Sequence, residues 1–118
     1  MAGKRILVVD DDQDITISMK AILESKGHTV IVAGNEKECM DKFNSEEPEI
    51  VFLDLMMESM ESGITLCRKI REKSRSVKIY LLSAVGDEAA GTIDIHETGF
   101  NGAMSKPVSP DELLDMVQ

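Results

Sequence analysis

Short apolar runs alternate with amphipathic segments from one end of the chain to the other. Strands buried in a parallel sheet are continuous apolar runs, whereas the helices that cover such a sheet repeat their apolar residues every three or four positions. Alternation of the two patterns is typical of βα units stacked side by side. We therefore predict an α/β fold in which a doubly wound, five-stranded parallel sheet carries helices on both faces.

The bounds of the predicted elements follow from where each pattern starts and stops. Strands are expected at residues 4–10, 29–33, 49–54 and 77–82, and in a short segment before residue 106. The first helix is expected to end at Gly27. Further helices are expected at residues 36–43, around residues 64–71, at residues 87–97 with Gly91 weakening the helix, and from Pro110 onward behind a Ser109 cap.

Length and composition indicate a soluble globular protein. The chain has 118 residues, of which 42% are hydrophobic and 30% are charged, so we expect one domain over residues 1–118, which a longer regulator or hybrid kinase could contain. A formal net charge of -9 argues against direct binding to nucleic acid or to an anionic membrane surface. Partners with basic patches, or a bound cation, fit this charge better.

The sequence indicates an intracellular protein with reduced thiols. No basic, apolar signal segment opens the chain, and no apolar stretch reaches the roughly 20 residues needed to span a bilayer, so we place the protein in the cytoplasm. Cys39 and Cys67 fall within helical patterns and outside any CxxC or Cys/His spacing. We interpret both as packing residues.

Polar residues stand where the predicted strands end. Asp10 and Asp11 follow the first run, Asp54 ends the third, Ser83 ends the fourth, and Lys106 follows the fifth. The carboxyl ends of parallel strands meet at one edge of a sheet, and ligands of doubly wound folds bind there. We therefore expect these side chains to form one site.

Such a cluster suggests phosphoryl chemistry beside a cation. Converging carboxylates repel one another unless a cation lies between them, and an all-oxygen ligand set favours Mg²⁺. Asp54, at the end of the most buried strand, is the best candidate for a nucleophile that forms an acyl phosphate. Lys106 and the Ser83 hydroxyl would then stabilise phosphoryl oxygens.

Each of these residues also has an ordinary structural interpretation. Asp is a favoured helix cap, and we assign that role to Asp12, the third residue of the acidic run. A lone Ser83, Asp54 or Lys106 would usually be a turn, cap or surface residue. The methionines after Asp54 are interpreted as packing residues. The functional hypothesis therefore depends on the co-occurrence of the acidic residues with the serine and the lysine.

These residues resemble the receiver domain of two-component response regulators, the CheY-like family. The resemblance covers essentially the whole chain and rests on four segments in order, which are ILVVDDD at residues 6–12, VFLDLMM at 51–57, LLSA at 81–84 and SKP at 105–107. It implies the flavodoxin-like strand order 2-1-3-4-5. It also implies a signalling switch rather than an enzyme.

The resemblance implies a role for each metal and acceptor residue. Asp10 and Asp11 match the acidic pair that holds Mg²⁺. Asp54 is expected to join them as a metal ligand, and it matches the phosphoacceptor, which receives its phosphoryl group from a sensor histidine kinase or a phosphotransfer domain. The backbone carbonyl of Met56 matches the position that completes the metal shell.

The resemblance also implies how the phosphoryl group is held and how the signal leaves the site. Lys106 matches the phosphate-binding lysine, and Pro107 would follow a cis peptide bond. Ser83 matches the switch hydroxyl, which acts on an attached output domain or on a downstream protein that the sequence does not identify.

The chain departs from the family pattern at two places near the site. After the acceptor the family often reads MMPGMDG, whereas residues 56–63 here read MMESMESG, without the proline and with the glycine one residue later. Ala103 stands where the family usually has a switch Phe or Tyr. Phe100 lies three residues earlier, and alternation along a strand predicts that it faces the opposite side. The segment between Ser83 and Lys106 is one residue longer than expected.

Three alternatives compete with the receiver hypothesis. A phosphatase of the haloacid dehalogenase type needs an acid two residues after its nucleophile, where this chain has Met56. A flavodoxin-like cofactor binder needs a hydroxyl- and amide-rich loop after the first strand, where this chain has carboxylates. A pseudo-receiver, which binds partners without phosphorylation, remains open because of Ala103 and the altered loop.

Overall fold

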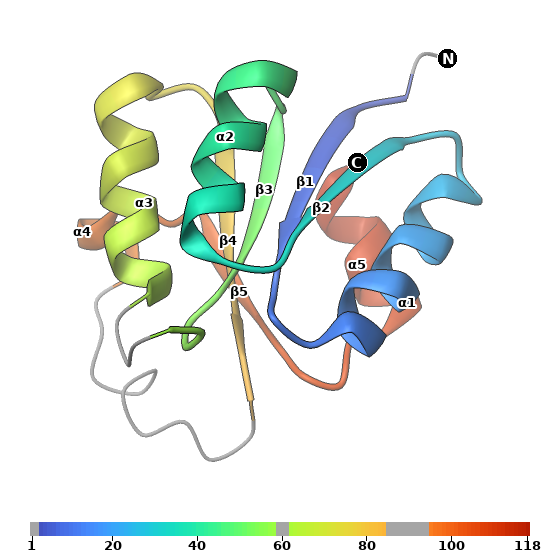
Figure 1. Ribbon diagram of the computed structural model, residues 1–118. Coiled ribbons are helices and arrows are strands. Elements are labelled where there is room, and N and C mark those ends of the chain that lie inside the picture. Colours follow the sequence, from blue (N-terminus) through green and yellow to red (C-terminus); the bar gives the residue numbers. More distant parts are fainter. Residues whose placement is uncertain (1–2, 59–61, 85–94) are drawn as a thin grey trace.

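The sheet has the predicted parallel topology. The computed structural model describes residues 3–58, 62–84 and 95–118. Within these residues, the strands pair in parallel in the order β2-β1-β3-β4-β5 (Figure 1). The prediction of a doubly wound, flavodoxin-like sheet is therefore confirmed. The strands are β1 (Arg5–Val9), β2 (Thr29–Ala33), β3 (Ile50–Asp54), β4 (Lys78–Ser83) and β5 (Gly102–Ser105).

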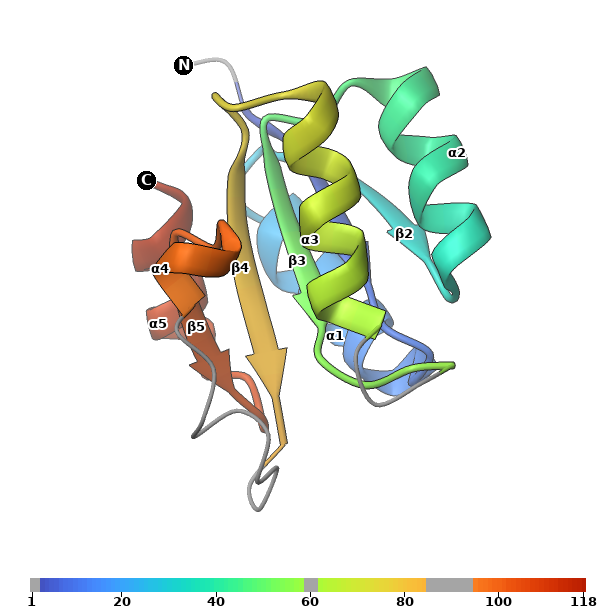
Figure 2. The same ribbon diagram turned by 90° about the vertical axis from the view of Figure 1, so that its left-hand side faces the viewer.

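Helices cover both faces of the sheet. In Figures 1 and 2, α1 and α5 lie on one face, whereas α2, α3 and α4 lie on the other. The helices are α1 (Gln13–Glu24), α2 (Glu36–Glu46), α3 (Ser62–Lys73), α4 (Ile95–Thr98) and α5 (Pro110–Val117). Most of the helix predicted at residues 87–97, including Gly91, and the extra residue expected near it, lie outside the described residues. No helix in the described ranges is long and apolar enough to cross a membrane.

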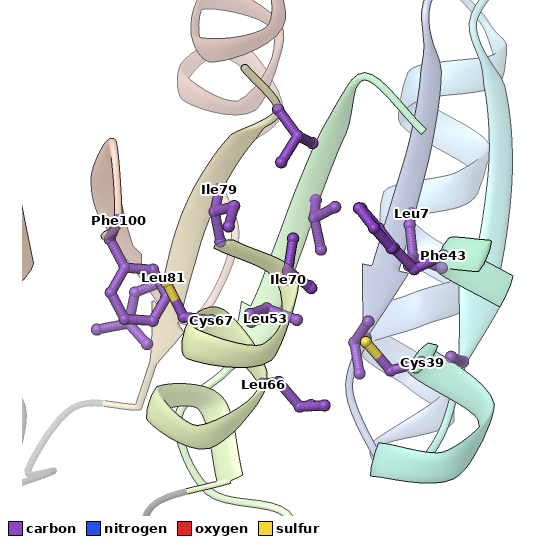
Figure 3. Close-up of a cluster of buried hydrophobic side chains, with 14 of the residues drawn as sticks. Leu7, Cys39, Phe43, Leu53, Leu66, Cys67, Ile70, Ile79, Leu81 and Phe100 are labelled. Carbon is purple, nitrogen blue, oxygen red and sulfur yellow. The ribbon is translucent and has the colours of Figure 1, made fainter. Parts of the chain in front are cut away.

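The interior strand β1 shows why the apolar runs are continuous. Its side chains alternate between two buried clusters, Ile6 and Val8 on the α1 and α5 side and Leu7 and Val9 on the α2 and α3 side. All four are fully buried, because helices cover both faces of the sheet. Figure 3 shows the cluster on the α2 and α3 side.

Both cysteines belong to this second cluster. Cys39 on α2 and Cys67 on α3 are free thiols that are fully buried (Figure 3). Burial raises the pKa of the Cys39 thiol to about 12 and that of the Cys67 thiol to about 11. Both thiols therefore stay protonated and serve as packing groups, as the sequence predicted.

Side-chain caps fix the helix starts at the predicted places. The Asp12 carboxylate accepts a hydrogen bond from the Asp14 amide, so Asp12 caps α1. Ser109 caps α5, and Pro110 is the first helical residue. The cap on α1 is important for the site because it turns the chain directly after β1, which leaves Asp10 and Asp11 at the sheet edge.

Candidate functional site

The acidic residues converge where the two most buried strands end. β1 and β3 are neighbours, and Val9 pairs with Leu53, so Asp10 and Asp54 follow at adjacent positions of the same edge. Carboxylate oxygens of Asp10, Asp11 and Asp54 all lie within 4.8 Å of one another. Asp10 is 1% exposed and Asp54 is 4% exposed, whereas Asp11 is open to solvent. The predicted cluster therefore forms, and one side of it is accessible.

Lys106 brings a positive charge into this cluster. Its ammonium lies 2.7 Å from Oδ2 of Asp10 and donates a hydrogen bond to Oδ1 of Asp54 at 3.0 Å. Its backbone amide donates to the Ser83 carbonyl at 2.8 Å, which ties the end of β5 to the end of β4. The Lys106-Pro107 peptide bond is cis, as the family resemblance implied.

Burial and charge perturb both partners of this ion pair. Burial, with a further contribution from the charge of Asp10, raises the pKa of Asp54 to about 6 although the Lys106 hydrogen bond acts in the opposite direction. Burial alone would lower the pKa of Lys106, but the carboxylates of Asp10 and Asp54 outweigh it and raise that pKa. Lys106 is therefore a permanent cation, and Asp54 is mainly ionised at neutral pH.

The donor set fits a divalent cation. Among the described residues, the buried Oδ2 of Asp10 has no hydrogen-bond partner of good geometry, although the Lys106 ammonium is close. A buried carboxylate oxygen without a directed hydrogen bond is costly, and a cation would satisfy it. Because every donor in the cluster is a carboxylate oxygen, the site suits a hard cation rather than a thiophilic metal.

Ser83 and Met56 border the cluster through their backbones. Ser83 is the last residue of β4, one position beyond Leu82, which pairs with Asp54. The Met56 amide lies 3.5 Å from Oδ1 of Asp54, and its side chain is 39% exposed. All the residues that the sequence predicted for the site therefore come to the same edge of the sheet.

Gly63 lies in contact with the backbone of the acceptor. Its amide donates to the Leu55 carbonyl at 3.0 Å, and a Cβ at this position would lie 2.6 Å from the Asp54 carbonyl oxygen. Residues 59–61 lie outside the described residues.

Glu58, which follows the acceptor in the same segment, makes a tertiary contact that the sequence did not reveal. Its Oε1 accepts a hydrogen bond from the Glu36 amide at 2.8 Å, across 22 residues of sequence. An exposed glutamate carries no local signal for such a partner, because the contact depends on how β3 and α2 are placed in the fold.

The prediction that Phe100 and Ala103 face opposite sides was wrong. Ala103 pairs with Leu81, whose side chain lies in the cluster on the α3 side, and Phe100 is 2% exposed in the same cluster (Figure 3). The reason is that Phe100 precedes β5. Its orientation is set by α4, because its amide donates a hydrogen bond to the Ile95 carbonyl. The alternation of a strand does not extend to this residue.

The chain is similar to proteins of one signalling family. The model of the response regulator receiver domain matches residues 6–118. The alkaline phosphatase synthesis transcriptional regulatory protein PhoP of Bacillus subtilis is 34% identical over 111 residues, which are 94% of this chain and 45% of PhoP. A 14.6 kDa protein encoded in the sodA1 3' region of Leptolyngbya boryana is 35% identical over 100% of this chain and 90% of its own length. The chain thus spans about half the length of PhoP.

Solved structures show the same fold. A CheY-like response regulator receiver domain protein from Methanospirillum hungatei superposes with a TM-score of 0.87 at 29% identity, covering 98% of this chain and 91% of the other. NtrX from Brucella abortus superposes with a TM-score of 0.88 at 27% identity, covering 98% of this chain and 26% of NtrX.

The acidic cluster and Lys106 lie at the carboxyl edge of the sheet. The sheet topology, the sequence match and the similar solved structures all indicate the same family. The chain therefore belongs to the response regulator receiver domain family of two-component signalling.

Proposed function

We propose that this receiver domain accepts a phosphoryl group on Asp54 in a Mg²⁺-dependent reaction and then presents a changed surface to a partner. Membership of the family implies a histidine kinase partner. The observation that carries the proposal is the convergence of the Asp10, Asp11 and Asp54 carboxylates, with the Lys106 ammonium beside Asp10 and Asp54. The donor would be the phosphohistidine of a sensor kinase or of a phosphotransfer domain.

The acceptor chemistry follows from the charges in the site. A carboxylate oxygen of Asp54 forms a bond to phosphorus while the bond from phosphorus to the donor nitrogen breaks, so the product is an acyl phosphate. A Mg²⁺ ion held by Asp10, Asp11, Asp54 and the Met56 carbonyl, when bound, would neutralise charge on the phosphoryl oxygens. Ionised Asp54 is buried beside Lys106, so the nucleophile is oriented and shielded from bulk water.

Lys106 and Ser83 are proposed to hold the product. The Lys106 ammonium already contacts Asp54, and a small movement of its flexible side chain would bring it to a phosphoryl oxygen. Ser83 ends the neighbouring strand, and its hydroxyl is proposed to donate to another phosphoryl oxygen. Because Lys106 and Ser83 are joined through their backbones, a shift at one is passed to the other.

The signal is proposed to leave through the segment after Ser83 and through α4. Ala103 has no ring that could rotate, so the usual aromatic movement is absent at this position. Comparing amide chemical shifts with and without a phosphoryl mimic tests this route. Changes confined to the metal loops would contradict it. The signal is proposed to act on an attached output domain or on a separate downstream protein, since PhoP extends well beyond the part that matches this chain.

A phosphorylation-independent interaction module is the second candidate. The observations that favour it are Ala103 and the altered loop after Met56. The first candidate requires a complete acceptor site, and the acids and the lysine are all present and converge.

Mass spectrometry separates the two candidates. The wild type and Asp54→Asn are incubated with acetyl phosphate, with and without Mg²⁺, and then treated with hydroxylamine. A Mg²⁺-dependent, hydroxylamine-labile phosphoryl adduct on the wild type alone is expected for the switch. A folded wild type that binds Mg²⁺ but forms no adduct would favour the interaction module.

A further inference from the structure

The backbone that follows the acceptor is fastened at two points. Leu55 is held on both sides, because its amide donates to the Leu82 carbonyl at 2.9 Å and its carbonyl accepts from the Gly63 amide at 3.0 Å. The second point is Glu58, whose Oε1 accepts a hydrogen bond from the Glu36 amide. Met56 lies between these two anchors. Its carbonyl is the one that the proposed function assigns to the metal.

The Glu36 amide needs a partner from outside its helix. Glu36 is the first residue of α2, so its amide has no carbonyl to bond within the helix. The neighbouring donors are satisfied locally, since the Asn35 side chain accepts from the Glu38 amide and the Glu38 side chain accepts from the Gly34 amide. Glu58 thus completes the start of α2, and a carboxylate is favoured at a helix start.

The start of α2 also belongs to the wall of the acidic cluster. The Asp10 amide donates to the Ala33 carbonyl at 3.1 Å, so the end of β2 is fixed to the first metal-ligand candidate. Residues Gly34, Asn35 and Glu38 line a groove together with Asp10 and Asp11. The Glu58 to Glu36 bond therefore joins the segment that carries Met56 to the segment that flanks the acidic pair.

We propose that Glu58 is a positioning residue, whose hydrogen bond to the Glu36 amide holds the Met56 carbonyl in place beside the acidic cluster. Glu58 acts through the backbone and is not proposed as a metal ligand. It stands in the part of the loop where the family pattern has a proline, so a tertiary hydrogen bond takes over the restraint that a fixed ring would give. The inference rests on the proposed function, because it needs the metal at this site.

Two variants separate the hydrogen bond from the charge. Glu58→Ala removes the acceptor, whereas Glu58→Gln keeps an acceptor oxygen and removes only the charge. Glu49→Ala is the matched control, because Glu49 is also an exposed glutamate that lies near a backbone amide, that of Arg5 at 3.5 Å, at the other end of β3. Mg²⁺ affinity is measured by calorimetric titration at fixed pH and ionic strength.

Glu58→Ala is expected to weaken Mg²⁺ binding by about tenfold, the lower end of the range for groups that orient metal ligands. The Mg²⁺ affinity of Glu58→Gln is expected to stay within about twofold of the wild-type value, and that of Glu49→Ala is expected to equal the wild-type value. In the metal-free protein, hydrogen exchange of the Glu36 amide should be faster in Glu58→Ala than in Glu58→Gln. Thermal unfolding of each variant verifies that it is folded.

Three results would overturn the inference. An unchanged Glu58→Ala affinity would show that the bond does not hold the metal segment. Equal losses in Glu58→Gln and Glu58→Ala would assign the effect to charge. A wild type that binds no Mg²⁺ would remove the proposed function and this inference together, whereas normal wild-type binding with an unaffected Glu58→Ala would remove the inference alone.

Discussion

The Lys106 ammonium donates a hydrogen bond to Oδ1 of Asp54 at 3.0 Å across the carboxyl edge of the sheet. The same ammonium lies 2.7 Å from Oδ2 of Asp10, so one lysine faces two buried carboxylates. One positive charge cannot neutralise two negative ones. The metal-free site therefore keeps a net negative charge, which affects stability, metal affinity and reactivity.

Asp54 should destabilise the metal-free protein at neutral pH. Its pKa is raised from 3.8 to about 6 on folding, with burial as the main cause. The folded state therefore binds the proton more tightly than the unfolded state, and the contribution of Asp54 to stability is lost as the pH rises from about 4 through 6. Asp54→Asn should stabilise the metal-free protein by about 2 to 3 kcal/mol at pH 7.5. Urea unfolding in EDTA measures this difference.

The pH dependence provides the control for that experiment. At pH 4 the gain from Asp54→Asn should nearly vanish, because the wild-type carboxyl is then protonated in the folded state. Asp115→Asn, on the exposed side of α5, should change stability little at either pH. A gain from Asp54→Asn of equal size at both pH values would mean that protonation is not its cause.

Lys106 should compete with Mg²⁺ for the acidic cluster. Removing the ammonium in Lys106→Met leaves the carboxylates without their internal cation, so Mg²⁺ should bind about threefold more tightly. Phosphorylation by acetyl phosphate should nevertheless slow by about tenfold or more, because the phosphoryl oxygens lose a positive partner. Calorimetry and intact mass measure the two effects. The control is Lys69→Met, which replaces an exposed lysine on α3 and should change neither the Mg²⁺ affinity nor the phosphorylation rate. A loss of both Mg²⁺ affinity and phosphorylation rate in Lys106→Met would contradict the competition.

The parts of the site that were predictable are those fixed by backbone direction. Asp10 and Asp54 follow continuous apolar runs, and any parallel sheet brings the carboxyl ends of such runs together. No side-chain detail is needed for that conclusion.

The predicted ends of the helices were less accurate, since α2 continues to Glu46 rather than to residue 43. Its C-cap is Glu47, which has a positive φ of 48°. A glycine at this position would have indicated the helix end in the sequence, but the chain has a glutamate there.

The features that were not predictable depend on partners distant in the sequence. Phe100 was assigned to the wrong face because the strand pattern was extended past the start of β5. The Asn101 side chain, which accepts from the Ile79 amide, sets that start, and nothing near Asn101 in sequence indicates the bond. Glu58 is missed for the same reason, since its partner lies on α2.

Gly63 should be intolerant of a side chain. A Cβ there would lie 2.6 Å from the Asp54 carbonyl oxygen and 2.9 Å from the Leu55 Cα, and both are backbone atoms that cannot rotate away. Gly63→Ala should therefore cost about 1 to 3 kcal/mol in stability and should also lower the rate of Asp54 phosphorylation. Denaturant unfolding and intact mass measure the two effects.

Gly34→Ala is the matched control for Gly63→Ala. Its added Cβ would lie 3.3 Å from the end of the Glu38 side chain, which can move. The substitution should change stability by less than about 0.5 kcal/mol. Similar effects at the two glycines would show that contact with the acceptor backbone is unimportant.

Arg71 should be the most sensitive charged residue of α3. Its guanidinium donates to the carbonyls of Gly99, Ser74 and Val77 at 2.9, 3.3 and 2.6 Å and to the Asn101 side chain at 2.8 Å. The fork of donors thus fastens the end of α3 to the start of β4 and to the turn before β5. A lysine has one nitrogen and cannot reach these acceptors together. Arg71→Lys should therefore cost about 1 to 3 kcal/mol, measured by urea unfolding.

The control for Arg71 lies on the same helix. Arg68 is exposed, so Arg68→Lys should change the free energy of unfolding by less than about 0.5 kcal/mol. In Arg71→Lys, hydrogen exchange should quicken at the Ile79 amide, whose acceptor is the Asn101 side chain that Arg71 holds. Loss of stability without faster exchange at Ile79 would mean that Arg71 stabilises α3 alone and does not organise the start of β5.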